Sequence, residues 1–251
     1  MTAYAQDADE RPVSDPAEAE AVIEKAVSYL GGNAYLNVST QISRGKFSIL
    51  RQGAVISFQS FYDVIVFPDR ERTEFKSGKL RNVQVNVGET GWVYDGDMEV
   101  VRDQTEIQLS NFKKGMRTSL DNLLRRHWKG EAKLEYVGKR PATLGKRNDV
   151  IKLIYDDGFE VEFEFGADNG IPAKAITRRT NANGEEVVEE DRYAQFVRIG
   201  NVLTPFIIDR FTNSVHSSRI NVESVEFNKR VSDDIFTKPA DVKTLRKSLT
   251  L

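Results

Sequence analysis

Alternation of apolar and polar side chains with a period of two residues is the feature that most constrains the fold of this 251-residue chain. Val83, Val85 and Val87 alternate with Asn and Gln, and residues 160–165 alternate Glu with Val or Phe. This pattern predicts antiparallel strands with one apolar and one polar face. Turn-type dipeptides recur between such stretches, at Ser77-Gly78, Asp95-Gly96, Asp157-Gly158, Asn169-Gly170 and Asn183-Gly184. The sequence therefore predicts an antiparallel meander rather than a parallel α/β fold.

Two stretches have the three- and four-residue spacing of apolar side chains that is typical of amphipathic helices. The first begins at Asp15-Pro16, where Asp15 is a candidate cap, and ends at Gly31-Gly32. The second runs from about Thr105 to Trp128 and contains Gly115, which weakens a helix from within. Each helix has a single apolar stripe, so each is expected to lie on another part of the protein.

The predicted order is one helix, about five strands, a second helix and about six strands. Because a sheet this wide rarely stays flat, we expect a mostly β (α+β) fold. Its core would be a single curved antiparallel sheet of about 11 strands, forming an unclosed β-barrel covered by two or three helices. We expect residues 1–14 to be a disordered leader, residues 15–240 to form the half-barrel domain, and residues 241–251 to be a basic C-terminal tail.

The first residues predict export. Ala3-Tyr4-Ala5, followed by Gln6, has the small-x-small form that precedes a signal-peptide cleavage site. Cleavage after Ala5 would leave a periplasmic protein; the alternative is a chance Ala-x-Ala in a disordered leader. No later segment approaches the ~20 apolar residues of a membrane span, so we expect the mature protein to be soluble.

Composition excludes several classes of site. The chain has no cysteine, which excludes disulfides, thiolate nucleophiles and cysteine metal sites. Its 36 basic and 38 acidic residues nearly balance, and no basic block stands out, so we expect no binding to nucleic acid. Metal-ligand and phosphate-loop spacings are also missing. We therefore predict no metal and no cofactor.

The search for catalytic residues finds no supporting motif. His127 lies in the apolar stripe of the second helix, where a packed or capping histidine is more ordinary than a general base. His216 has no Asp or Glu at a motif spacing. The densest carboxylates, at 156–157, 185–186 and 189–191, are better explained by a solvated face than by a catalytic pair. We predict that the protein is not an enzyme.

One predicted strand, Ala54 to Phe67, is apolar on both faces. One face holds Ile56, Phe58, Tyr62, Val64 and Val66, and the other holds Val55, Phe61, Ile65 and Phe67. A strand of this kind is covered on both sides. One cover could be a helix and the other a ligand or a partner, and an ordinary two-sided core explains the pattern equally well.

Three short stretches carry a family resemblance. The first is Phe67-Pro68-Asp69-Arg70-Glu71-Arg72, a proline followed by basic residues, and the second is Gly88-Glu89-Thr90-Gly91-Trp92-Val93-Tyr94. The third is Asp233-Asp234-Ile235-Phe236-Thr237-Lys238-Pro239. In this order, and within a helix, strands, helix, strands layout, they resemble the LolA-like periplasmic lipoprotein carriers, also called outer-membrane lipoprotein-sorting proteins. The resemblance spans about Pro16 to Pro239.

The resemblance implies an unclosed β-barrel whose helices form a lid over an apolar cavity for acyl chains. The family has an arginine directly before the proline, which ties down the lid. Phe67 stands there in this chain. Either Arg70 or Arg72 takes that role, or the lid is held differently. The chain is also longer than a typical carrier, with additional strand material after Gly130.

Candidate site residues follow from the apolar strand faces and from the second helix. The candidate cavity residues are Phe47, Ile49, Ile56, Phe58, Val64, Val66, Val85, Trp92 and Tyr94 from strands, with Met116, Leu120 and Leu124 on the underside of the lid. The candidate polar residues of the rim and lid are Arg44, Arg70 and Arg72. Arg44 and Lys46 could contact a headgroup, although a solvated strand face is the more ordinary interpretation.

We therefore expect a monomeric periplasmic carrier or chaperone that binds the acyl chains of a lipoprotein, or a free lipid, for transfer toward the outer membrane. Such a carrier would make transient contact with inner- and outer-membrane transport proteins. An alternative on the same fold is a periplasmic sensor or regulatory adaptor, although such regulators usually carry a second domain. A lipid- or glycan-processing enzyme that uses a carboxylate pair is a third possibility, without a supporting motif.

Overall fold

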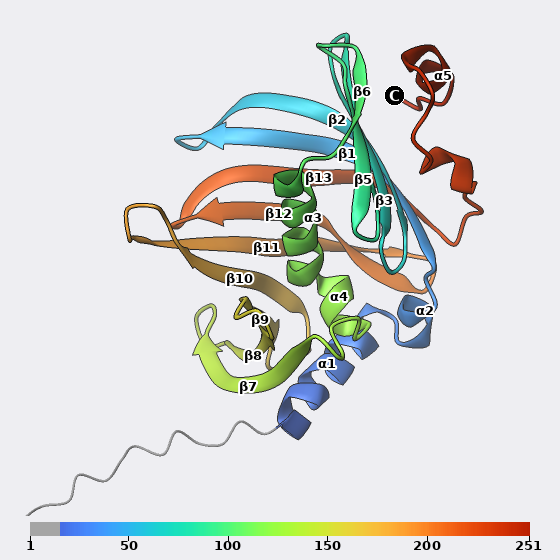
Figure 1. Cartoon of the computed structure of the whole chain (residues 1–251). Coiled ribbons are helices and arrows are strands. Elements are labelled where there is room, and N and C mark those ends of the chain that lie inside the picture. The colour runs from blue at the N-terminus through green and yellow to red at the C-terminus, as the bar shows by residue number, and fades with distance from the viewer. Residues whose placement is uncertain (1–15) are drawn as a thin grey trace, which may run out of the picture.

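The computed structural model describes residues 16–251. The leader predicted for residues 1–14 and the Asp15 cap therefore lie outside the described residues. In the described part of the chain, thirteen strands form one antiparallel sheet (Figure 1). The strands are β1 (Thr40–Arg51), β2 (Ala54–Val66), β3 (Arg70–Ser77), β4 (Leu80–Val87), β5 (Thr90–Asp95), β6 (Val100–Asp103), β7 (Ala132–Pro141), β8 (Arg147–Tyr155), β9 (Glu160–Gly166), β10 (Pro172–Thr180), β11 (Glu186–Ile199), β12 (Val202–Thr212) and β13 (Val215–Phe227).

The sheet consists of two meanders joined by one long-range strand pair. Its order is β6-β5-β4-β3-β2-β1-β13-β12-β11-β10-β9-β8-β7. The first and last strands of the chain, β1 and β13, pair antiparallel in the middle, while β6 and β7 form the two free edges. The predicted fold class is confirmed: the sheet is curved and unclosed (Figure 1). The count of about 11 strands was low by two, partly because β6 is short and lacks a clear alternation.

The second predicted helix is two helices. The helices are α1 (Pro16–Leu30), α2 (Asn33–Leu36), α3 (Glu106–Thr118), α4 (Leu120–Leu124) and α5 (Val242–Lys247), with a 3₁₀ turn η1 (Asp233–Ile235). Gly115 does not break α3; the break comes at Ser119, which has extended backbone angles. The Ser119 Oγ accepts a hydrogen bond from the Asn122 backbone N–H at 3.1 Å, so this residue caps α4.

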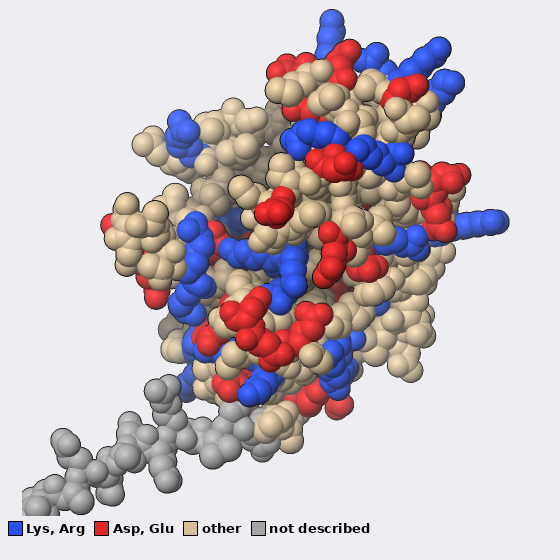
Figure 2. Space-filling model, in the orientation of Figure 1, with Lys and Arg blue, Asp and Glu red and all other residues tan. Residues whose placement is uncertain are grey.

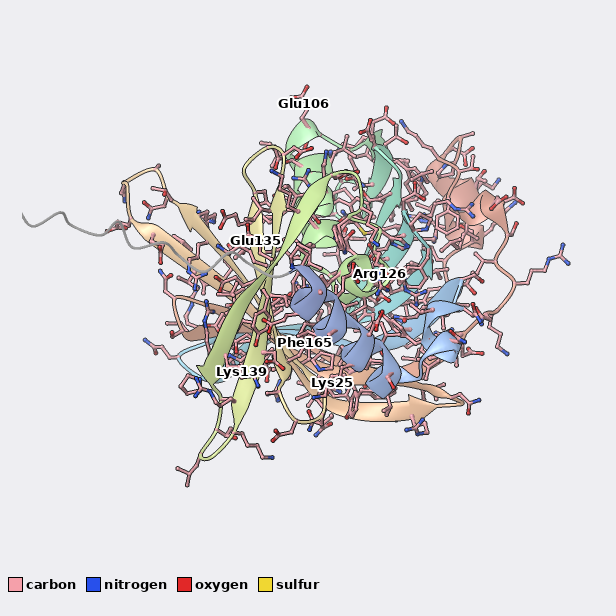
Figure 3. The ribbon with its side chains drawn as sticks, turned by 90° about the horizontal axis from the view of Figure 1, so that it is seen from below. Lys25, Glu106, Arg126, Glu135, Lys139 and Phe165 are labelled. Carbon is pink, nitrogen blue, oxygen red and sulfur yellow. The ribbon has the colours of Figure 1, made fainter. Side chains whose placement is uncertain are left out.

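A dense apolar core holds α1 against one end of the sheet. The side chains of Ile23 and Leu30 on α1 pack with those of Leu123 on α4 and with Ile151 and Phe165 on β8 and β9. Figure 3 shows α1 lying across these strands with Phe165 beside it. This core buries the single apolar stripe that the sequence predicts for α1.

A second core lies on the outer, convex face of β2 to β5. It is covered by residues 228–251, here named the C-terminal segment, which includes η1 and α5 (Figure 1). Phe236 and Leu245 of this segment are buried against Val64, Val85 and Trp92. Residues 241–251 were expected to form a separate basic tail, but residues 242–247 of this stretch fold into α5, and Leu245 is only 1% exposed.

A buried ion pair fastens the C-terminal segment. The Arg72 guanidinium donates to the Glu74 carboxylate at 2.8 Å and to the backbone carbonyl of Ile235 at 2.9 Å. The same carboxylate accepts the backbone N–H groups of Thr250 and Leu251 at 2.8 and 3.1 Å. Because both side chains are almost fully buried, each charge depends on the other for its solvation.

Replacing Arg72→Met should destabilise the protein by about 3–5 kcal/mol, because it leaves the Glu74 carboxylate buried without its cation. The free energy of unfolding from urea titration measures this. The matched control is Lys46→Met, whose pair with Glu223 is half exposed and should contribute less than about 1 kcal/mol. An equal loss in the two variants would contradict the role given to the buried pair.

Candidate ligand-binding cavity

A cavity of about 640 Å³ lies between the inner, concave face of the sheet and the helices α3 and α4. Odd-numbered residues of β1 and β2 form part of its wall, among them Ser43, Phe47, Phe61, Asp63 and Ile65. Residues of the central strands β12 and β13 form another part of the cavity wall. A volume of this size is typical of sites that enclose a small organic ligand.

The helices and the central strands supply the apolar part of the wall. Phe112 and Met116 of α3 and Leu120 of α4 lie across the cavity from apolar side chains of β12 and β13, including Ile208 and Ile220. The helix α3 has an apolar stripe, yet none of its residues is fully buried. The stripe therefore faces the cavity rather than a packed core.

The strands β1 to β4 supply a polar band inside the same cavity. Cross-strand pairing places Ser43, Asp63, Thr73 and Gln84 in one row, and all four line the cavity. In the neighbouring row, Glu71 pairs with Asn86, and both of these also line the cavity. Since side chains in a row point to the same face, the register alone gathers these polar groups.

Two carboxyl groups in this band share one hydroxyl. The Thr73 Oγ1 lies 2.8 Å from Asp63 Oδ1 and 3.3 Å from Glu71 Oε1. Burial, and after it the neighbouring Glu71 carboxyl, raise the pKa of Asp63 well above its ordinary value. Burial also raises the pKa of Glu71. One hydroxyl hydrogen cannot serve both carboxylates, so the pair is satisfied when one of the two is protonated.

One arginine fastens the lid helix α4. The Arg125 guanidinium donates to the backbone carbonyls of Tyr35, Leu36 and Val38 at 3.0, 3.1 and 2.9 Å. It also binds the Asp121 carboxylate at 2.8 Å and stacks 4.1 Å above the Phe67 ring. The lid is thus held differently from the family pattern: the cation is at the end of the lid helix, and the aromatic ring is in the turn between β2 and β3.

Arg70 and Arg72 do not hold the lid. Arg70 lines the cavity but pairs with Asp233 of the C-terminal segment at 2.6 Å. Arg72 lies on the outer face, in the buried pair described above. Arg44, the third candidate for the rim, also points outward and stacks 4.5 Å from the Tyr62 ring.

The structure brings only part of the predicted cavity set together. Phe47, Met116 and Leu120 line the cavity. A larger group lies instead in the outer core under the C-terminal segment, namely Val64, Val66, Val85, Trp92 and Tyr94. Their placement in the cavity is corrected, because strand phase was undetermined and a shift of one residue moves every side chain to the opposite face.

The remaining predicted residues lie away from the cavity as well. Leu124 is buried in the core beneath α1. Ile49, Ile56 and Phe58 lie near the end of the β1–β2 hairpin and are 40%, 53% and 59% exposed. Figure 2 shows this hairpin end as a mostly tan protrusion that carries a blue basic group.

Sequence reasoning missed several lining residues that no apolar pattern marks. Tyr193 and Asp191 on β11 and Arg210 on β12 line the cavity, with Arg210 and Asp191 paired at 3.5 Å. Asp63 and Thr73 were missed for the same reason, since polar residues on a strand are ordinarily assigned to the solvent face. A usable signal was the two-sided strand 54–67, whose second face holds Phe61 and Ile65.

Solved structures match this chain over most of its length. A LolA superfamily protein from Nitrosomonas europaea aligns with 88% of this chain and 97% of its own, at 15% identity and a TM-score of 0.60. A putative outer membrane lipoprotein-sorting protein domain from Vibrio parahaemolyticus covers the same shares at 13% identity and a TM-score of 0.60. This chain has a LolA-like fold. A DUF1329 family protein from Desulfovibrio piger ATCC 29098 shares it, at 15% identity and a TM-score of 0.63 over 87% of this chain and 97% of its own.

The LolA-like fold confirms the resemblance that the three short motifs carry. No family model and no curated protein matches the sequence, so the likeness lies in the architecture. Within residues 16–251, no helix is long and apolar enough to cross a bilayer. The same residues contain no group of three or more His, Asp or Glu side chains arranged to hold a metal ion.

Replacing Arg125→Ala should loosen α4, because three backbone carbonyls and Asp121 lose a charged donor. A hydrogen bond to a charged group contributes about 1.5–3 kcal/mol, so amide hydrogen exchange over residues 106–124 should accelerate about tenfold or more. Mass spectrometry of the exchanging protein measures this. Arg246→Ala, which removes an exposed pair with Glu99, should leave exchange in α4 unchanged; equal acceleration in both would refute the assignment.

The raised pKa of Asp63 predicts a pH-dependent stability. The folded protein keeps a proton that the unfolded chain releases near its ordinary pKa of about 3.9. The contribution of Asp63 to the free energy of unfolding therefore falls as pH rises from that value to the folded pKa. Asp63→Asn should remove this loss, so its stability relative to wild type should increase with pH across that range. Urea titrations at a series of pH values test it; a constant difference would contradict it.

Proposed function

We propose that this protein binds the apolar chain of a lipid, or the acyl chain of a lipoprotein, in the cavity beneath α3 and α4. The observation that carries the proposal is the cavity of about 640 Å³, whose helical wall includes Phe112 and Met116 of α3, a helix with no fully buried residue. Apolar side chains that line an unfilled space lack van der Waals contacts on that side. An apolar guest supplies those contacts.

The size of the hydrophobic effect supports reversible binding of such a guest. Each buried methylene contributes about 0.8 kcal/mol, so a chain of about sixteen carbons represents on the order of 12 kcal/mol before costs. Ordering the chain and opening the lid consume part of that energy. The result is an affinity tight enough to hold a lipid and weak enough to release it to a second membrane or protein.

The LolA-like fold extends the proposal to a place in the cell. Two proteins of this fold carry printed descriptions that name the LolA superfamily and outer membrane lipoprotein sorting. We propose that this chain acts likewise in the periplasm, as a non-enzymatic carrier or chaperone that moves its ligand toward the outer membrane. It would do so through transient contacts with transport proteins of the two membranes.

A variant that fills the cavity tests the proposal. Gly115 of α3 lines the cavity, and a Cβ atom added there meets no other atom within 4 Å. Gly115→Phe should therefore fold, and its ring should take up space that the ligand needs. We expect uptake of the uncharged apolar probe N-phenylnaphthylamine to fall about tenfold, which corresponds to losing about two methylene contacts.

The matched control is Gly115→Ala, which adds one methyl group at the same position. It should bind N-phenylnaphthylamine as wild type does and gain about 1 kcal/mol of stability, because alanine is the better helix former. A second blocking variant, Met116→Asp, places a charge in the apolar wall and should also reduce uptake. Wild-type uptake in both blocking variants, or no co-purified lipid in native mass spectrometry, would count against the proposed function.

A further inference from the structure

The polar band of the cavity contains an acidic pair that no cation neutralises. Three cations line the cavity, and each has a carboxylate partner: Arg70 with Asp233, Arg125 with Asp121, and Arg210 with Asp191. Burial and the nearby Arg125 lower the pKa of the fourth basic group, His127, so it is neutral at pH 7.

Asp63 and Glu71 form no ion pair with these groups or with any other cation described in residues 16–251. Arg210 is near enough to lower the pKa of Glu71 slightly, but its own partner is Asp191. The surface that the two carboxyl groups expose faces the cavity. The band thus has an excess of negative charge and of hydrogen-bond acceptors.

An unpaired hydroxyl beside the pair is a second feature of the band. Ser43 lies directly across the strand pair from Asp63, lines the cavity and is only 5% exposed. In the described part of the chain its hydroxyl has no hydrogen-bond partner, and the oxygen is not among the fully enclosed unpaired atoms of those residues. The hydroxyl is therefore open to the cavity and available to a polar group that enters it.

We propose that the ligand is an amphiphile with a protonated amine in its polar part, which donates hydrogen bonds to Asp63 and Glu71 while its chain lies along α3 and α4. This inference rests on the proposed function and names its ligand class. The amine neutralises the charge that remains on the pair when one carboxyl group is protonated, and it donates hydrogen bonds to the acceptor oxygens of both. A carboxylate or phosphate headgroup would instead meet like charge at short range in a site of low dielectric.

The experiment compares amphiphiles of one chain length. The full chain is loaded with the apolar probe N-phenylnaphthylamine. Dodecylamine, dodecanol and dodecanoate then compete with the probe, each kept below its solubility limit and, for the two charged amphiphiles, below the critical micelle concentration. Dodecylamine should displace the probe at an about tenfold lower concentration than dodecanol, because a charge-assisted hydrogen bond contributes about 1.5–3 kcal/mol. Dodecanoate should be the weakest competitor of the three.

Variants separate a binding role from a structural one. In Asp63→Asn and Glu71→Gln, the advantage of dodecylamine over dodecanol should disappear, while dodecanol itself competes as it does in wild type. The equal competition by dodecanol shows that the cavity is folded. Glu160→Gln, which removes an exposed carboxylate paired with Lys152, is the matched control and should retain the full preference for the amine.

Equal or stronger competition by dodecanoate, or an amine preference that survives both substitutions, would overturn the inference and leave the proposed function standing, since apolar chains would still enter the cavity. Failure of the protein to take up the probe or any of the three amphiphiles would overturn both.

Discussion

The register of strands β1 to β4 is the constraint on which the rest of the molecule depends. Antiparallel pairing sets Ser43, Asp63 and Thr73 in one inward-facing row. The residues next to each of them along its own strand then point to the outer face. A slip of one residue would turn Val64 into the cavity and Asp63 out of it. The polar band, the outer core and the seat of the C-terminal segment are therefore consequences of a single pairing pattern.

The two faces of β2 differ because the C-terminal segment packs on the outer face, whereas the inner face borders the cavity. The outer face around Val64 and Val66 is covered by Phe236 and Leu245, and the Arg72–Glu74 pair fixes that cover in place. The inner face borders the cavity beneath α3 and α4. On that face Phe61 is already buried, while Ile65 lines the cavity.

The sequence predicted the architecture well and the site poorly, and the reason is physical. Alternation and turn dipeptides report strands whatever their partners are, so the curved sheet followed from them. They do not report which face is inner when a strand such as 54–67 is apolar on both sides. Trp92 was therefore expected in the cavity although it lies in the outer core, and Asp63, a polar residue on a strand, was not recognised as a lining residue. The cover formed by Phe236 and Leu245 was missed because apolar residues are few in this polar stretch.

A cavity wall that is partly polar changes how the empty protein behaves. Carboxyl, amide and hydroxyl groups such as Asp63, Gln84 and Ser43 can hold water, which a purely apolar cavity cannot. Water bound to these polar groups would lower the free-energy cost of an empty cavity. The apolar stripe of α3 would still lack apolar contacts. In the function proposed above, a guest that binds only the folded protein would supply them and would stabilise the fold more, the more tightly it binds. Order in α3 would then depend on occupancy, and the helix that retains the ligand would be easier to open once the ligand has left.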